Sequence, residues 1–357
     1  MTGIQVDVDT LVWTREGFHR RALQAPPSQP ARLTLEEYRS LTASKRKTYN
    51  AARFLWHEKL EFIPLTTTAG KVVKVISDLV ASQPNPESTP KRGIWIDGES
   101  NSGKTTATQE ACYRLIREEL ATGELAPSGS YKTPVVWIDL SERPTFRAIN
   151  RDGCTFLNAR DLVSSARVSP AHRDQTAHAL ASTFASWAIA CGVRIVVLDD
   201  THNLKNRFAD ADMTGNYLKH LMTLVPAVFV LVGTDIEKNT QLLNEGSPLG
   251  RLRTQTAHRF KHHKVPAFAN RTDGQREAWL GALKSVEKRL VLCSSTRGML
   301  TSRPDYIFER TNGFIGSLVA FARDATFAAI TQTTDERVDD GLLDGITADY
   351  AAESGAW

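Results

Sequence analysis

The chain has 357 residues, of which 41% are hydrophobic and 24% charged, values typical of globular proteins rather than disordered or fibrous ones. Residues 331–357 carry seven acidic side chains against Arg337 alone, so the rest of the chain is more basic than the net charge of +4 indicates. This charge is compatible with a polyanionic partner and equally with ordinary surface lysines and arginines balanced by an acidic end. No window approaches the roughly 18 uninterrupted apolar residues of a membrane helix. The N-terminus lacks the basic end and apolar run of a secretory signal, so we expect a cytoplasmic protein without membrane contact. The cysteines form no CxxC pair, and we expect four buried, reduced thiols.

Residues 1–60 are expected to form a basic helical arm. A first helix is expected to be capped at Leu33 or Thr34 through the two glutamates that follow, and a second helix to begin near Thr42 or Ser44. The side chains that give the arm its charge, and that we expect to contact DNA phosphates, include Lys45, Arg46, Lys47 and Arg53.

From about residue 71 the pattern changes to alternating helices and strands. Strands are expected at 93–97, 134–140, 193–200 and 226–234, and helices at 71–81, 104–120, 175–190 and 214–224. Apolar strands without alternation, separated by helices, indicate a parallel sheet covered on both faces. From about residue 271 strands largely stop, and helices are expected at 275–292 and 314–331. The expected division is therefore an arm (1–60), an α/β core (61–268) and a helical lid with an acidic C-terminal end (269–357).

The strongest motif is a phosphate-binding loop directly after the strand 93–97. GESNSGKTT matches GxxxxGK[ST] and precedes a helix, a context that leaves little room for a chance glycine-rich turn. Its backbone amides are expected to wrap phosphates, with Lys104 reaching the β- and γ-phosphates of ATP and Thr105 offering its hydroxyl to Mg²⁺. The predicted nucleotide-binding residues are Gly98, Glu99, Ser100, Asn101, Ser102, Gly103, Lys104, Thr105 and Thr106.

Two aspartates follow the apolar strand IVVL. Their position at the carboxyl end of a parallel strand is where α/β sheets bind ligands. Asp199 is expected to hold Mg²⁺, directly or through water, and Asp200 to polarise the attacking water. Many ATPases have a glutamate at the second position, and the aspartate is about 1.5 Å shorter, so we expect slow hydrolysis. The alternative is an Asp-Asp turn that caps the next helix.

Two further catalytic candidates have ordinary alternatives. Thr234, with Asp235 second, ends the strand 226–234 and is a candidate to position the lytic water, or else belongs to a helix-capping turn. Arg259, in the basic stretch 251–264, is a candidate to neutralise charge on the phosphate of a neighbouring subunit. A solvated basic loop and contact with DNA phosphate are the alternatives.

With these motifs in place, the chain resembles the AAA+ ATPases of transposition of the TniB and TnsC type, and more distantly the phage Mu B protein and the helicase loaders. The resemblance runs in family order over about residues 60–350. The segments that carry it are GESNSGKTT, WIDLSERPTFRAIN, VVLDDTHNLK, YLKHLMTLVPAVFVLVGTDIEKNTQLL, AHRF and NGFIGSLVAFARDATFAAI.

The resemblance implies a P-loop AAA+ domain of the α/β class, with a small helical lid after it and the basic arm before it. It implies a protein that binds ATP and Mg²⁺, assembles as a ring or filament on duplex DNA, and recruits or stimulates a DDE transposase, with hydrolysis driving disassembly. By position, Gly98 to Thr106 carry the nucleotide, Asp199 the magnesium and Arg259 the arginine in trans. The sequence departs from the pattern at Asp200 and in the lid helix, where no arginine stands at the second-sensor position and Arg323 comes about two turns late.

Other functions remain open at this stage, because the fold alone does not choose among them. The alternatives are a nucleotide-switch ATPase of signalling or defence, a helicase-loader-like protein and a small-molecule P-loop kinase. If DNA is bound, the contacts are expected to be mainly to phosphate, since the sequence has no zinc-finger or helix-turn-helix pattern.

Overall fold

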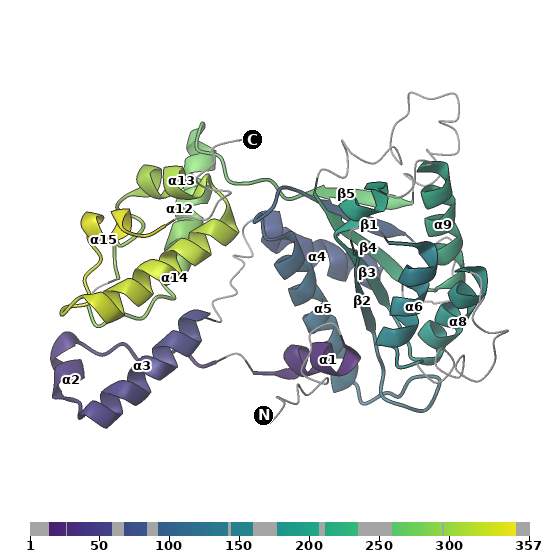
Figure 1. Cartoon of the computed structure of the whole chain (residues 1–357), viewed down its shortest axis with the longest axis horizontal. Helices are drawn as coiled ribbons and strands as arrows, with labels where there is room; N and C mark the ends of the chain where they lie inside the picture. Colours follow the sequence, from purple (N-terminus) through teal and green to yellow (C-terminus); the bar gives the residue numbers. More distant parts are fainter. Residues whose placement is uncertain are drawn as a thin grey trace, which may run out of the picture. The chain divides into compact units, whose positions relative to one another are not determined.

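The computed structural model describes residues 14–25, 27–58, 68–83, 92–141, 144–159, 177–206, 211–234, 259–294 and 296–347 (Figure 1). The chain forms two compact units. Unit 1 comprises Met1–Gln24, Lys71–Gly98 and Ala107–Val265, and unit 2 comprises Ala25–Gly70, Glu99–Thr106 and Pro266–Trp357.

Unit 1 is built on a parallel five-stranded sheet in the order β2-β3-β4-β1-β5. The strands are β1 (Gly93–Asp97), β2 (Val135–Asp139), β3 (Ile195–Asp199), β4 (Val228–Gly233) and β5 (Phe260–Lys264). Asp139 pairs with Asp199 across β2 and β3, and Asp97 pairs with Gly233 across β1 and β4. The carboxyl ends of all these strands therefore lie along one edge of the sheet.

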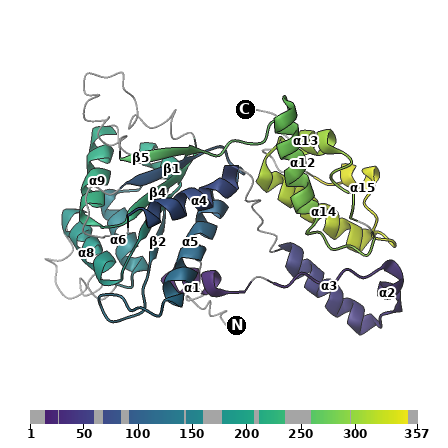
Figure 2. The ribbon, with the colours of Figure 1, turned by 180° about the vertical axis from the view of Figure 1, so that it is seen from behind.

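Helices cover both faces of the sheet, which confirms the predicted α/β class. In both views α4 (Thr68–Ala81) and α5 (Lys104–Ala121) lie on one face, and α6 (Phe146–Phe156), α8 (Ala177–Ala190) and α9 (Ala211–Leu224) on the other (Figures 1 and 2). Every residue of β1, β3 and β4 is buried, because side chains on both sides of each strand meet a helix layer.

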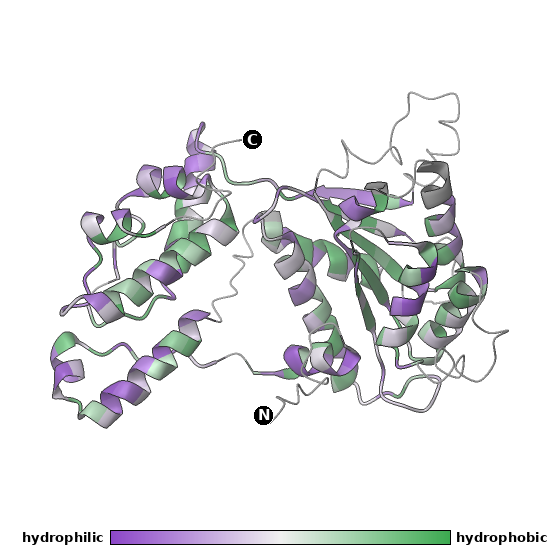
Figure 3. Ribbon diagram, in the orientation of Figure 1, coloured by the Kyte–Doolittle hydropathy of each residue, from purple (hydrophilic) through white to green (hydrophobic). Residues whose placement is uncertain are grey.

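The edge strand β5 was not predicted. Its sequence FKHHK lies in the basic stretch 251–264, for which a solvated loop was one alternative and no strand was expected, and it is hydrophilic beside the apolar inner strands (Figure 3). An edge strand needs one partner only, and charged side chains are tolerated there. A Cβ on Gly93 would lie 2.4 Å from the ring of Phe260, so glycine at this position lets the two strands pack. The ring of Phe260 stacks on Trp95 at 5.2 Å.

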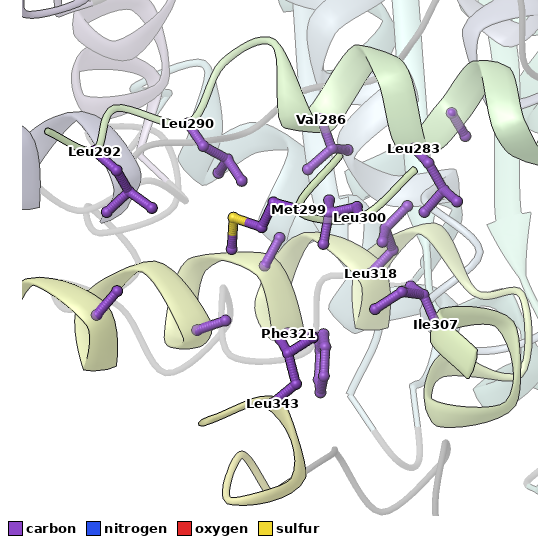
Figure 4. Packing of buried hydrophobic residues seen from close by; sticks show 14 of the residues in the cluster. Leu283, Val286, Leu290, Leu292, Met299, Leu300, Ile307, Leu318, Phe321 and Leu343 are labelled. Carbon is purple, nitrogen blue, oxygen red and sulfur yellow. The ribbon is translucent and has the colours of Figure 1, made fainter. Parts of the chain in front are cut away.

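Unit 2 is a helical body with its own apolar core (Figure 4). Its helices include α12 (Asp273–Glu287), α13 (Pro304–Thr311), α14 (Ile315–Gln332) and α15 (Asp340–Asp344). The core side chains that Figure 4 labels come from these helices and from the segments between them. Each large apolar side chain in it contributes about 1.5–3 kcal/mol relative to exposure.

The arm does not form a body of its own. Phe18 of α1 (Arg15–Leu23) packs in unit 1 against the rings of Tyr113 and Trp137, at 5.0 and 5.6 Å. The helices α2 (Leu35–Ser40) and α3 (Ala43–Glu58) belong to unit 2. The predicted cap of α2 is confirmed, since Thr34 and Glu37 form a reciprocal capping box. Contacts between segments far apart in the sequence assign α1 to unit 1 and α2 and α3 to unit 2. The expected division at residues 60 and 268 did not include these contacts.

Arg53 was expected on a DNA-binding surface, and that expectation is wrong. Its side chain is 0% exposed and donates to both carboxylate oxygens of Glu336, at 2.6 and 2.8 Å. The guanidinium lies 4.7 Å from the ring centroid of Tyr49. A charge removed from water needs such a partner, so Arg53 joins α3 to the lid and is not available to DNA.

Periodicity predicted a helix that runs to residue 292, but α12 ends at Glu287. Contacts with the arm explain this earlier end. Trp56 Nε1 donates to the carbonyl of Arg289 at 2.8 Å, and the amide of Val291 donates to His57 Nε2 at 3.0 Å. These side chains satisfy backbone groups that would otherwise need another helical turn.

Two expectations from composition can be compared with the fold. Cys112, Cys154, Cys191 and Cys293 are free and buried, as predicted. Within the described ranges no single helix is long and apolar enough to span a membrane, and α13 and α14, which together would be, are bent by 111° at the break between them.

Candidate functional site

The predicted phosphate-binding loop connects β1 to α5. Asn101 and Gly103 have φ of 60° and 88°, and such left-handed residues turn backbone amides toward the inside of a loop. Lys104, at the start of α5, is 7% exposed, and its Nζ donates to the carbonyl of Glu99 at 2.6 Å. The side chain thus lies back over the loop, and Thr105 and Thr106 follow it in the first helical turn.

Ser102 gives a test of whether this loop fits a ligand. Its side chain is 2% exposed, and its Oγ has no hydrogen-bond partner among the residues that the structure describes. A buried hydroxyl without a partner costs about 1–3 kcal/mol. A phosphate oxygen held in the loop would supply that partner, so the loop fits a bound phosphate group.

The lid helix α14 contacts this loop within unit 2. The amide of Gly316 donates to the carbonyl of Asn101 at 2.9 Å. A Cβ on Gly316 would lie 3.0 Å from that oxygen, and a Cβ on Gly103 would lie 3.1 Å from Cγ2 of Ile315. Sequence reasoning missed this contact, although the closely spaced glycines of NGFIG were a signal for a close approach.

The two aspartates after β3 have different environments. Asp199 is 5% exposed, and its Oδ1 accepts from the amide of Asp200 at 2.9 Å. Asp200 has φ of 56° and a side chain 60% exposed, with Oδ1 3.8 Å from Nδ1 of His202. Backbone strain of about 1–3 kcal/mol at a non-glycine residue is typical of functional sites. Asp199 is thus held by the sheet, whereas Asp200 faces solvent.

Bonds across the sheet edge fix the segment after Asp200. Thr201 Oγ1 donates to the carbonyl of Val232 in β4, and Asn203 Nδ2 donates to the carbonyl of Leu140 after β2, both at 2.9 Å. Thr234 comes directly after β4 and is half-buried. Asp235, the second candidate there, lies outside the described residues.

Two further acids at this edge were missed. Asp97 and Asp139 end strands that both close with Trp-Ile-Asp, a repetition visible in the sequence. Asp97 Oδ2 lies 3.6 Å from His262 Nε2 on β5. Burial raises the pKa of Asp139, and the negative charge of Asp200 raises it further. The hydrogen bond from Trp137 lowers this pKa but does not outweigh the burial. The edge therefore concentrates negative charge, although the described residues hold no group of three or more His, Cys, Asp or Glu that could bind a metal ion.

Arg259 lies where the strands begin, opposite the row of carboxyl ends that carries the aspartates. It directly precedes β5, and its carbonyl accepts from the amide of Gly93, the first residue of β1, at 2.8 Å. Since β1 and β5 are parallel and Gly93 lies opposite Phe260, Arg259 and Gly98 are separated by six residue steps, about 20 Å along the strands. The other candidate arginines of the stretch, at 251 and 253, lie outside the described residues.

The family described as Bacterial TniB protein matches residues 54–270, which is more than half of the chain. The chain belongs to the TniB family. The match begins inside α3. The elements of this TniB-family protein outside the matched residues include α1, α2 and the lid from α12 onward. No curated protein matches the chain by sequence.

Solved structures share the α/β fold of this TniB-family chain at low sequence identity. The Aeropyrum pernix ORC1 protein in complex with DNA has a TM-score of 0.53 and 12% identity, over 84% of this chain and 68% of that one. The Aeropyrum pernix ORC2 protein, in its ADPNP-ADP complexes, has a TM-score of 0.50 and 13% identity, over 77% of this chain. The match spans 65% of the length of the ORC2 chain. At this identity the likeness establishes the fold.

Proposed function

We propose that this protein is an ATP-dependent, DNA-binding regulator of transposition. With ATP bound it assembles on duplex DNA as a ring or filament and recruits or stimulates a DDE transposase, and hydrolysis drives disassembly. The observation that carries the proposal is the strand order. Because β3, β4 and β1 are parallel neighbours in that order, the chain leaves the same sheet edge, on adjacent strands, at Asp199, Thr234 and Gly98. Membership of the TniB family supports the biological role.

In the proposed site the loop residues 98–106 bind the triphosphate of ATP. The inward-turned amides and Ser102 Oγ hold phosphate oxygens, and Lys104 exchanges the Glu99 carbonyl for the β- and γ-phosphates. Thr105 and Asp199 hold Mg²⁺, which supplies charge neutralisation on the phosphates when bound. Magnesium usually keeps several waters and takes one or two protein ligands, so a site of two residues is sufficient.

Hydrolysis depends on water placed near the γ-phosphate. Asp200 polarises this water and Thr234 positions it. The aspartate is about one methylene, or 1.5 Å, shorter than a glutamate, and its side chain is mostly exposed. Both features support slow turnover, which suits an assembly whose lifetime on DNA is set by the bound nucleotide.

Arg259 acts on the nucleotide of a neighbouring subunit. Its position at the opposite end of the strands from Gly98 supports a role away from the phosphate-binding loop of its own chain. An arginine supplied in trans makes hydrolysis depend on assembly. This supports self-association as part of the mechanism.

The test is sedimentation and electron microscopy of the full chain with duplex DNA, with and without a non-hydrolysable ATP analogue. We expect assemblies that need both ligands. Lys104→Ala should abolish them, because its charge is needed at the phosphates, whereas Lys74→Ala, at an exposed position on α4, should not. Assemblies that form equally without nucleotide, or with Lys104→Ala, would show that nucleotide does not control assembly.

A further inference from the structure

Unit 2 contains a cavity of about 380 Å³ between the loop that precedes α2, the helix α12 and the segments 292–294 and 296–297. We call it the arm–lid pocket. Its lining includes four cationic side chains that come from three separate segments, namely Arg32, Lys284, Lys288 and Arg297. All four are exposed. The favourable interaction of lysines with the carboxyl end of α12 accounts for Lys284 and Lys288, but it does not account for the two arginines.

Among the lining residues there is one carboxylate, Glu287, against the four cations. Glu287 accepts from the amides of Gly298, Leu300 and Thr301 at 2.9, 2.8 and 3.0 Å. Its carboxylate holds the turn 298–301 and offsets only one of the four positive charges. The pocket presents a surplus of positive charge to any ligand that enters it.

The walls of the pocket are held in place by hydrogen bonds. Arg32 Nη2 donates to the carbonyl of Lys288 at 2.6 Å, which joins the arm to the end of α12. Tyr49 of α3 donates to the carbonyl of Ala31 at 2.7 Å and accepts from the amide of Leu33 at 3.3 Å. A guanidinium has five N–H donors, so Arg32 retains donors for an anion while it holds this position.

We infer that the arm–lid pocket, with Arg32, Lys284, Lys288 and Arg297, grips the phosphate backbone of duplex DNA. The inference rests on the proposed function and locates its DNA contact. Lys284 and Lys288 stand one turn apart, about 6 Å along α12, and successive phosphates of a strand advance about 3.4 Å along the duplex. The two lysines can therefore engage phosphates of one strand.

Two observations favour DNA over an acidic protein segment. Protein interfaces are anchored by large apolar or aromatic side chains, and the lining contains only Leu33 and the buried Leu292 of that kind. The exposed basic stretch 45–47 of α3 begins one turn before Tyr49, which contacts the loop of the pocket. Positive charge thus extends beyond the pocket, as a long polyanion requires.

The test measures the salt dependence of duplex binding by the full chain with a non-hydrolysable ATP analogue. The pocket variant is Lys284→Gln/Lys288→Gln, and the control with the same charge change is Lys71→Gln/Lys74→Gln on α4, where both lysines are exposed. Each lost phosphate contact lowers the slope of log affinity against log salt by about 0.9. We expect the pocket variant to lose about 1.8 in slope, so that the ratio of wild-type to variant affinity falls about 12-fold between 50 and 200 mM salt.

The outcomes separate this inference from the proposed function. A reduced slope in the pocket variant alone, with an unchanged melting temperature, supports the inference. Equal slopes in wild type, variant and control overturn it, and the pocket then serves a different partner such as an acidic protein segment. A wild-type protein that does not bind duplex DNA with nucleotide present contradicts the proposed function itself.

Discussion

Replacing Glu336 tests whether the arm is an integral part of unit 2. Its carboxylate receives two hydrogen bonds from Arg53, whose guanidinium also lies 5.3 and 4.7 Å from the ring centroids of Tyr38 and Tyr49. In Glu336→Ala the guanidinium stays buried without its charge partner, which costs about 3–5 kcal/mol. For a domain of ordinary size this corresponds to a fall of about 6–20 °C in the melting temperature of unit 2.

The same pair makes the stability of unit 2 depend on pH. Burial raises the pKa of Glu336, but hydrogen bonds from Arg53 and from the amide of Cys293 outweigh it and hold the pKa below its ordinary 4.5. A carboxyl whose pKa is lowered by folding stabilises the protein fully at pH values above its pKa in the unfolded chain. This contribution is lost as the pH falls through its pKa in the folded protein. The difference in melting temperature between wild type and Glu336→Ala should therefore shrink below about pH 4.5.

Calorimetry and hydrogen exchange measure the effect in separate parts of the chain. In Glu336→Ala the amides of α3 should exchange faster, while those of β3 and β4 in unit 1 stay protected. Arg53→Met/Glu336→Leu should recover most of the stability, because an apolar pair leaves no buried charge. Arg46→Ala, at an exposed position of α3, is the control. Unchanged melting and unchanged α3 protection in Glu336→Ala would refute the reasoning.

Two further predictions concern the nucleotide site. Gly316→Ala places a Cβ 3.0 Å from the carbonyl of Asn101. It should weaken binding of a fluorescent ATP analogue about tenfold, since overpacking costs about 1–3 kcal/mol. The control Gly281→Ala, whose Cβ meets no described atom within 4 Å, should leave this binding unchanged. Equal affinities in the two variants would mean that α14 does not position the loop. Arg259→Ala should keep ATP binding and lose hydrolysis on DNA by about 10³-fold or more, and mixing it with Lys104→Ala should restore part of the activity. Loss of ATP binding in Arg259→Ala would indicate a local structural role instead.

The phosphate-binding loop, the inner strands and Asp199 were predictable because their signals are local. The strand 93–97 was predicted with its observed bounds, and the strand that ends at Asp199 was predicted within two residues at its start. A run of apolar residues followed by a polar one specifies a buried strand and its functional end without reference to any distant partner. The Thr34 capping box was predictable for the same reason, since both of its members lie within one turn.

The strand β5 and the lid contact at Gly316 were not predictable in this way. FKHHK has the composition of a solvated loop, and it is a strand because β1 offers a free edge to which its backbone bonds. The contact between Gly316 and Asn101 joins residues more than 200 positions apart. Such pairs leave no periodic signal in the chain.

By itself the sequence determined the class of the sheet, the motif of the loop after β1 and the aspartate pair 199–200 after β3, because periodicity and short motifs act over a few residues. The tertiary structure decided that Arg53 is buried against Glu336, that Arg259 lies at the opposite end of the strands from Gly98, and that the arm and α12 enclose a basic pocket. The physical reason is that the role of a charged side chain depends on whether its partner is water or another residue. That partner is set by segments brought together only when the chain folds.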